Sequence, residues 1–188
     1  MTGHAGRWPA ASSHGQQSAA HCPPQYTAQC ASDLLPMIHS YRITKYTQRD
    51  RRGYLTSPPS EWTSVSDVGT KVTEADYLLV EQAYLDAIGQ LCTGLGVTAL
   101  RVNGLEPADA AEVHEGQVLD LDAVEHIARQ VLRERLWCKL VAPDVEFHFG
   151  YDYYLYVVSK VDPVVPLARI AASLTVDRYL SPYLETAG

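Results

Sequence analysis

Segments with helical spacing of apolar residues alternate along this chain with short segments in which every second residue is apolar. The clearest strand signal is Val145 to Phe149, whose apolar residues point to one face while Glu146 and His148 point to the other. The clearest helical stripe follows Asp120, where apolar residues recur three or four positions apart. Because each apolar face must be buried against another element, the pattern predicts an α+β domain with a mainly antiparallel sheet.

The predicted order of elements is β-α-β-α-β-β-α-β, a sheet of four to five strands with two to three helices packed on one face. Strands are predicted over residues 41–46, 97–102, 145–149, 153–158 and 175–179, and helices over 74–93, 120–140 and 162–174. Thr73 is expected to cap the first helix, Gly94 or Gly96 to end it, and Asp162 to cap the third. The acidic segment 103–120 is expected to be a solvated connection.

The amino-terminal residues 1–37 stand outside this pattern. The first 36 are rich in Ser, Gln, Ala, His and Pro and carry only two charged residues, Arg7 and Asp33, which is typical of disorder or of a linker. We therefore expect a single α+β domain over 38–188, preceded by an extension over 1–37 that is disordered or wrongly assigned to the protein. One economical hypothesis makes Met37 the true first residue.

Charge and cysteine usage exclude several functional classes. The chain has 15 Lys plus Arg against 22 Asp plus Glu, a net charge of -7 that disfavours nucleic acid as a partner. Its apolar runs are far shorter than the roughly 20 residues of a transmembrane helix, which predicts no membrane partner. The four cysteines, Cys22, Cys30, Cys92 and Cys138, lack paired spacing, which favours a reduced, cytoplasmic setting and predicts no metal. No cofactor is predicted.

The segment from Glu146 to Tyr156 is the densest local signal, with four tyrosines within six residues. Tyrosine offers a large contact area and a polar tip at low entropic cost, so rings that face away from the core favour a recognition surface. Strand alternation places Tyr154 and Tyr156 opposite Tyr153 and Leu155. The alternative is that these rings only stabilise the sheet through cross-strand contacts.

A second unusual segment, Glu61 to Gly69, combines an aromatic anchor with small hydroxyl residues and an acid. Trp62 is interpreted as a cover of the core or as a contact for a ligand, and Asp67 as a residue that caps a turn or binds. The candidate binding residues from both segments are Trp62, Asp67, Glu146, His148, Tyr151, Asp152, Tyr154 and Tyr156.

An enzymatic alternative centres on His148 and Asp152, since imidazole and carboxylate are the usual groups of acid–base chemistry. The sequence shows no G-x-S-x-G motif and no phosphate-binding glycine loop, so no catalytic residue is predicted. The alternative is therefore a small-ligand-binding protein or a hydrolase-like enzyme with its site near these two residues.

Five stretches, YRITKY, GYL, EWTSVSDVG, RERLWCKL and HFGYDYYLYV, resemble a group of small uncharacterised bacterial proteins. The group shares an opening I-T-K-Y, an E-W-T-S-x-S-D-x-G segment, W-C-K-L and G-Y-D-Y-Y, and the likeness covers residues 38 to about 183. Small acidic α+β proteins of this kind resemble immunity proteins, which mask the active site of a toxin. The resemblance implies a non-enzymatic macromolecule-binding protein with a protein partner such as a basic toxin; a structural subunit of a larger assembly is the remaining alternative.

Overall fold

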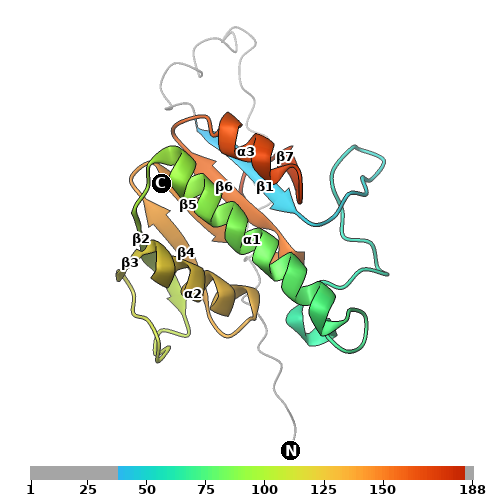
Figure 1. The fold of residues 1–188 in the computed structure, drawn as a ribbon, viewed down its shortest axis with the longest axis horizontal. Helices are drawn as coiled ribbons and strands as arrows, with labels where there is room; N and C mark the ends of the chain where they lie inside the picture. The colour runs from blue at the N-terminus through green and yellow to red at the C-terminus, as the bar shows by residue number, and fades with distance from the viewer. Residues whose placement is uncertain (1–37, 185–188) are drawn as a thin grey trace, which may run out of the picture. The chain divides into compact units, whose positions relative to one another are not determined.

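The computed structural model describes residues 38–184, which form one sheet with three α-helices on one of its faces (Figure 1). The strands are β1 (His39–Thr44), β2 (Ala99–Glu106), β3 (Val118–Asp120), β4 (Trp137–Ala142), β5 (Val145–Phe149), β6 (Leu155–Ser159) and β7 (Thr175–Arg178). The helices are α1 (Glu74–Leu95), α2 (Leu121–Leu132) and α3 (Val164–Ile170), with short 3-10 turns η1 (Val65–Asp67) and η2 (Tyr151–Tyr153). The strand order is β3-β2-β4-β5-β6-β1-β7, and each neighbouring pair is antiparallel.

The α+β class is confirmed, but the predicted count of four to five strands is wrong, because the described sheet has seven. One additional strand, β4, comes from a segment predicted as the end of the second helix. The helix α2 ends at Leu132, and Glu134 adopts a left-handed φ of 57° that interrupts helical geometry. Cys138 and Leu140 are then fully buried at alternate positions of β4. A short apolar run is compatible with the periodicity of a helix and with that of a strand. Its pairing with β2 and β5 therefore decides its conformation.

The other additional strand, β3, lies in the segment predicted as a solvated connection. The strand β2 continues to Glu106, and β3 pairs with its beginning through Leu119, which lies opposite Leu100. Both side chains are buried, with exposed fractions of 2% and 1%. The connection therefore covers only residues 107–117. The acidic composition of the segment led to the prediction of a loop where β3 forms, and pairing with β2 buries one side of β3.

The first helix follows its local signals closely. The Thr73 hydroxyl accepts a hydrogen bond from the Asp76 amide at 3.1 Å, and Gly96 ends the helix with a φ of 69°. At 22 residues, α1 is the longest described helix, and none of the described helices is long and apolar enough to cross a membrane.

The predicted cap of the third helix is wrong. The helix α3 begins after Pro163, with no hydrogen bond from a capping side chain. The Asp162 carboxylate instead accepts a hydrogen bond from the Tyr41 hydroxyl at 2.9 Å and lies 3.5 Å from Nδ1 of His39. Tertiary partners on β1 therefore hold this carboxylate away from the first turn of the helix.

The sheet buries side chains on both faces, but their chemistry differs. Toward the helices lie apolar side chains with exposed fractions of 0%, namely Ile43, Leu140, Phe147, Leu155 and Val157. Burial of each contributes about 1.5–3 kcal/mol. On the opposite face Arg42, His148 and Tyr156 are also buried, at 5%, 0% and 6% exposure. Polar groups that lie away from the helices and yet out of solvent must be covered by another part of the chain.

Candidate functional site

Four polar side chains form a row across the sheet face that lies away from the helices. Strand register pairs His148 of β5 with Tyr156 of β6. It also pairs Tyr156 with Arg42 of β1, and Arg42 with Asp177 of β7. Paired residues of neighbouring strands point to the same face, so imidazole, phenol, guanidinium and carboxylate lie side by side.

Aromatic rings surround this row and form a continuous array, which we call the aromatic face. Its members are Tyr54, Trp137, Tyr154, Tyr156, Tyr179 and Tyr183. Successive ring centroids lie between 5.8 and 6.5 Å apart, within the range in which edge and offset contacts are favourable. Tyr179 and Tyr183 come from the carboxy-terminal end of the described chain, which therefore covers this side of the sheet.

Arg42 is the centre of this array. Its guanidinium lies 4.7 Å from the centroid of the Tyr154 ring and 4.3 Å from that of Tyr179, so two rings sandwich the cation. One terminal nitrogen donates to the Leu55 carbonyl at 3.1 Å and lies 3.6 Å from the Asp177 carboxylate. The buried Nε has no hydrogen-bond partner among the described residues. The stacking fixes both tyrosine rings in place.

His148 links the sheet to the carboxy-terminal end of the described chain. Its Nδ1 lies 2.8 Å from Oγ of Ser181, and its Nε2 lies 2.8 Å from Oε2 of Glu146. The hydrogen bond from His148 lowers the pKa of the Glu146 carboxyl below its usual value, so this group is ionised at neutral pH. A carboxylate accepts from Nε2–H, which leaves Nδ1 of a neutral imidazole to accept from the Ser181 hydroxyl.

The three tyrosines predicted as binding residues differ in solvent exposure. Tyr151 is 45% exposed, Tyr154 is half-buried, and Tyr156 is only 6% exposed. Tyr154 and Tyr156 lie on the face away from Leu155, as strand alternation predicts, but Tyr183 packs over Tyr156 at a centroid distance of 5.9 Å. Burial raises the pKa of the Tyr156 phenol to about 12, so it is neutral under ordinary conditions.

Trp62 and Asp67 lie in a different cluster. The Trp62 ring is 7% exposed and contacts the Tyr153 ring at a centroid distance of 4.9 Å, which closes the core under the loop before α1. Nζ of Lys45 lies 4.1 Å from the same indole. The Asp67 carboxylate accepts from the Thr63 amide at 2.8 Å, and this bond lowers the pKa of the carboxyl. These contacts organise the loop.

Asp152 is separated from His148 by its contacts. Its carboxylate accepts a hydrogen bond from the Ser57 hydroxyl at 2.7 Å, whereas His148 is engaged by Ser181 and Glu146. Asp152 and Tyr153 adopt left-handed φ values of 56° and 57°, so the strand predicted over 153–158 begins only at Leu155. The two groups of the enzymatic alternative therefore bond to different residues within the described part of the chain.

Sequence reasoning missed Arg42, Ser181 and Tyr183. The first lies at a polar position of an alternating strand, a pattern that predicts its face but not its burial. The other two lie beyond the last predicted strand, where no periodicity exists. Their roles arise from contacts with residues distant in the sequence, such as the one between His148 and Ser181, which lie 33 positions apart.

Two of the four cysteines can be placed. Cys92 and Cys138 are free and fully buried, and burial raises the pKa of their thiols to about 11 and about 12. Cys22 and Cys30 lie outside the described residues. Among residues 38–184, no group of three or more His, Cys, Asp or Glu side chains is arranged to hold a metal ion.

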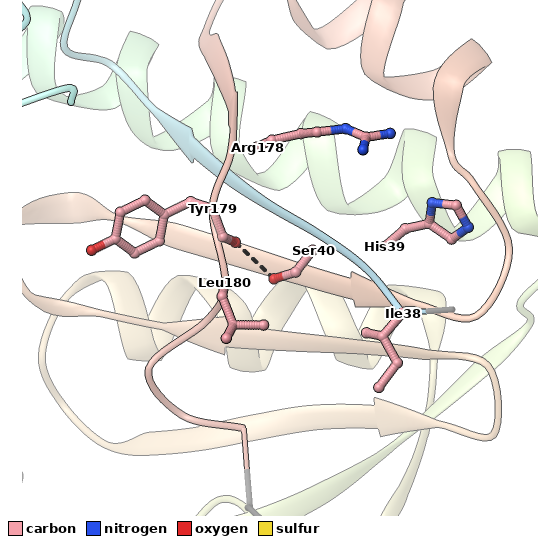
Figure 2. A pocket seen from close by; sticks show the side chains of 6 residues that line it. All are labelled: Ile38, His39, Ser40, Arg178, Tyr179 and Leu180. Atoms are coloured by element: carbon pink, nitrogen blue, oxygen red, sulfur yellow. Dashed lines mark hydrogen bonds between the residues drawn. The ribbon is translucent and has the colours of Figure 1, made fainter. Parts of the chain in front are cut away.

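A shallow pocket of about 300 Å³ opens where the chain leaves β7 (Figure 2). It is lined by Ile38, His39, Ser40, Arg178, Tyr179 and Leu180. The Ser40 hydroxyl donates to the Tyr179 carbonyl at 2.8 Å across this site, as the dashed line shows. The pocket therefore marks the point at which the carboxy-terminal end separates from β1.

Comparisons with protein-family models, with curated proteins and with solved structures found no match to this chain. The resemblance to small bacterial proteins and to immunity proteins remains an expectation from the sequence.

Proposed function

We propose that the chain is a non-enzymatic protein-binding domain that contacts its partner through the aromatic face. The observation that carries the proposal is the continuous array of rings, of which Tyr54 is 51% exposed and Tyr154 and Tyr179 are half-buried. Tyrosine rings that are already held by their neighbours lose little entropy on binding, and their hydroxyl groups remain able to form hydrogen bonds. Such residues supply much of the binding energy at protein interfaces.

The shape of the array favours a macromolecule over a small ligand. The rings lie side by side over β4, β6 and the carboxy-terminal end, and Arg42 and His148 beneath them are held by stacking and hydrogen bonds. A small ligand needs a cavity that encloses most of its surface. A broad aromatic array with polar tips suits another protein.

The charge beside the array favours a basic partner. Between Val102 and Ala128 the chain has no Lys or Arg and seven exposed acids: Glu106, Asp109, Glu112, Glu115, Asp120, Asp122 and Glu125. Glu106 lies opposite Trp137 in the sheet, so the acidic segment begins at the edge of the aromatic face. Acidic residues at an interface rim accelerate association with a basic protein. A basic toxin is the partner class we propose, and this would make the chain an immunity protein.

The test is co-expression with a basic toxin encoded by a neighbouring gene, followed by calorimetric titration of the purified proteins. The double variant Tyr54→Ala/Tyr151→Ala removes the exposed ring of Tyr54 from the aromatic face and the exposed ring of Tyr151, whose backbone forms a hydrogen bond with Tyr183 at the rim of that face. It is expected to weaken binding by about tenfold or more. Leu79→Ala is the matched control, because Leu79 is 71% exposed on α1, on the other side of the sheet. A wild-type chain that neither binds nor protects cells would contradict the proposal, as would a double variant that binds like the wild type.

The Ser181, His148 and Glu146 hydrogen bonds favour a second candidate, a hydrolase that uses Ser181 as nucleophile. The order hydroxyl, imidazole, carboxylate is that of a serine hydrolase relay. Ser181 is 2% exposed, which keeps substrate from its Oγ in this conformation. A fluorophosphonate probe tests the alternative: labelling of Ser181 that is lost in His148→Gln would support it, and an unlabelled Ser181 would exclude it.

A further inference from the structure

The carboxy-terminal segment, residues 179–184, is attached to the sheet by a few hydrogen bonds and by the rings of Tyr179 and Tyr183. The Tyr179 amide donates to the Ser40 carbonyl at 3.2 Å, and the Ser181 amide donates to Oγ of Ser40 at 3.0 Å. The Ser181 hydroxyl reaches His148 at 2.8 Å and also accepts from the Tyr183 amide at 3.3 Å. Ser40 and His148 are thus the two attachment points, on β1 and β5.

The aromatic contacts of the carboxy-terminal segment come from two half-buried rings, Tyr179 and Tyr183. Its one buried residue is Ser181, Leu180 is 70% exposed, and Tyr179, Tyr183 and Leu184 are half-buried. Segments with few buried apolar contacts open at lower free energy than the strands of a core. The carboxy-terminal segment therefore has the contacts of a locally opening unit.

The side chains beneath the carboxy-terminal segment tolerate water. The Tyr183 ring lies over His148, Tyr156 and Trp137, with centroid distances of 6.3, 5.9 and 5.8 Å. Imidazole and phenol regain hydrogen bonds to solvent when uncovered, whereas the helix-facing layer that includes Phe147 would lose its whole hydrophobic stabilisation. Lifting the carboxy-terminal segment thus uncovers His148, Tyr156 and Trp137 and leaves the core intact.

We infer that the carboxy-terminal segment is a lid that opens while the sheet stays folded and that, when closed, withholds His148 and Tyr156 from a partner. The lid turns about Ser40 of β1, beside the pocket of Figure 2, where the segment that follows β7 separates from β1. The withholding of the two side chains rests on the proposed function, whereas the opening itself does not.

Amide hydrogen exchange followed by NMR on the full chain tests the opening. Protection factors of the Ser181 and Tyr183 amides are expected to be about a hundredfold lower than those of the protected amides in β5 and β6. Equal protection in the carboxy-terminal segment and the two strands would mean that both open only by global unfolding, and this result would overturn the inference.

Three variants separate a lid from a structural part of the sheet. Ser181→Ala removes the bond to His148 and Tyr183→Ala removes the ring contacts, so each is expected to accelerate exchange in the carboxy-terminal segment by about tenfold and leave β5 and β6 unchanged. Leu180→Ala is the control, since its exposed side chain makes no anchoring contact and its exchange should match the wild type. Equal acceleration of β5 and β6 would contradict the lid.

Hydroxyl-radical footprinting and toxin titration then distinguish the two proposals. Ser181→Ala removes the bond to His148 and keeps every ring of the aromatic face. It is expected to increase oxidation of His148 and Tyr156, and unchanged oxidation would refute the lid. The same variant is expected to bind the toxin more tightly than the wild type, because a larger fraction of molecules has the face uncovered. If oxidation increases but binding does not become tighter, the lid opens as inferred, but the closed lid does not keep His148 and Tyr156 from the toxin. If the wild type binds no toxin at all, the proposed function is refuted and the exchange result stands.

Discussion

Gly150→Ala adds one methyl group directly against the Tyr156 ring of the aromatic face. The backbone at Gly150 has φ -105° and ψ 175°, which alanine adopts without strain. An added Cβ would lie 2.8 Å from Cε2 of Tyr156, closer than two carbon atoms approach. The Tyr156 ring is 6% exposed and has neighbouring rings at 5.9 and 6.0 Å, so it cannot simply swing away. We expect a loss of about 1–3 kcal/mol in the free energy of unfolding, measured by urea denaturation.

Gly89→Ala is the matched control and is expected to have the opposite sign. Gly89 lies inside α1, and no neighbouring side chain lies within 4 Å of the position that an added Cβ would take, so alanine improves helix propensity by about 0.5–1 kcal/mol. In a Tyr156→Ala background, the cost of Gly150→Ala should disappear, because the clashing ring is gone. Equal stability of Gly150→Ala and the wild type, or an undiminished cost in that background, would refute the packing explanation.

Three further predictions concern local contacts. Thr73→Ala removes the cap of α1 and should cost about 1 kcal/mol in the same denaturation assay; an unchanged midpoint would contradict the capping role. The folded-state pKa of Glu146 is lowered, so its stabilising contribution is full above the ordinary glutamate pKa of 4.5 and is lost as pH falls through the folded-state pKa. Glu146→Gln should therefore flatten the loss of stability in that acidic range, and an unaltered pH profile would count against the bond to His148. Native Cys92 and Cys138, whose thiol pKa values burial raises, should escape alkylation at a pH of about 8 in peptide mapping, whereas rapid modification would show that they are accessible.

The lid and the aromatic face together suggest how a small acidic domain could control access to its own contact surface. Arg42 holds Tyr154 and Tyr179 by stacking on both. The attachment of the carboxy-terminal segment at Ser40 and His148 is polar and local. Tyr154 and the other rings outside the carboxy-terminal segment are therefore held in place before a partner arrives, whereas Tyr179 and Tyr183 belong to the cover. This division separates the cost of organising the surface from the cost of exposing it.

Local chemistry decided the parts of this fold that the sequence predicted well. The α1 helix begins at Thr73 and ends before Gly96 because a hydroxyl cap and a left-handed glycine act within one turn of the chain. The hairpin of β5 and β6 follows from alternation, although Asp152 and Tyr153 shorten it. These features depend on residues that are close in the sequence, so a short stretch of sequence is enough to predict them.

Only the tertiary structure decided β4, β3 and the composition of the candidate site. Residues 137–142 fit a helical stripe as well as a strand, and pairing on both sides selected the strand. Strand alternation places His148 on the polar face, yet its exposed fraction is 0% where Ser181 and Tyr183 contact it, 33 and 35 positions later. The amino-acid pattern alone determined the fold class, the first helix and the face on which the residues of β5 and β6 lie. Long-range pairing and the returning end of the chain determined which polar residues are covered, because burial depends on what packs on top and not on the period of the strand beneath.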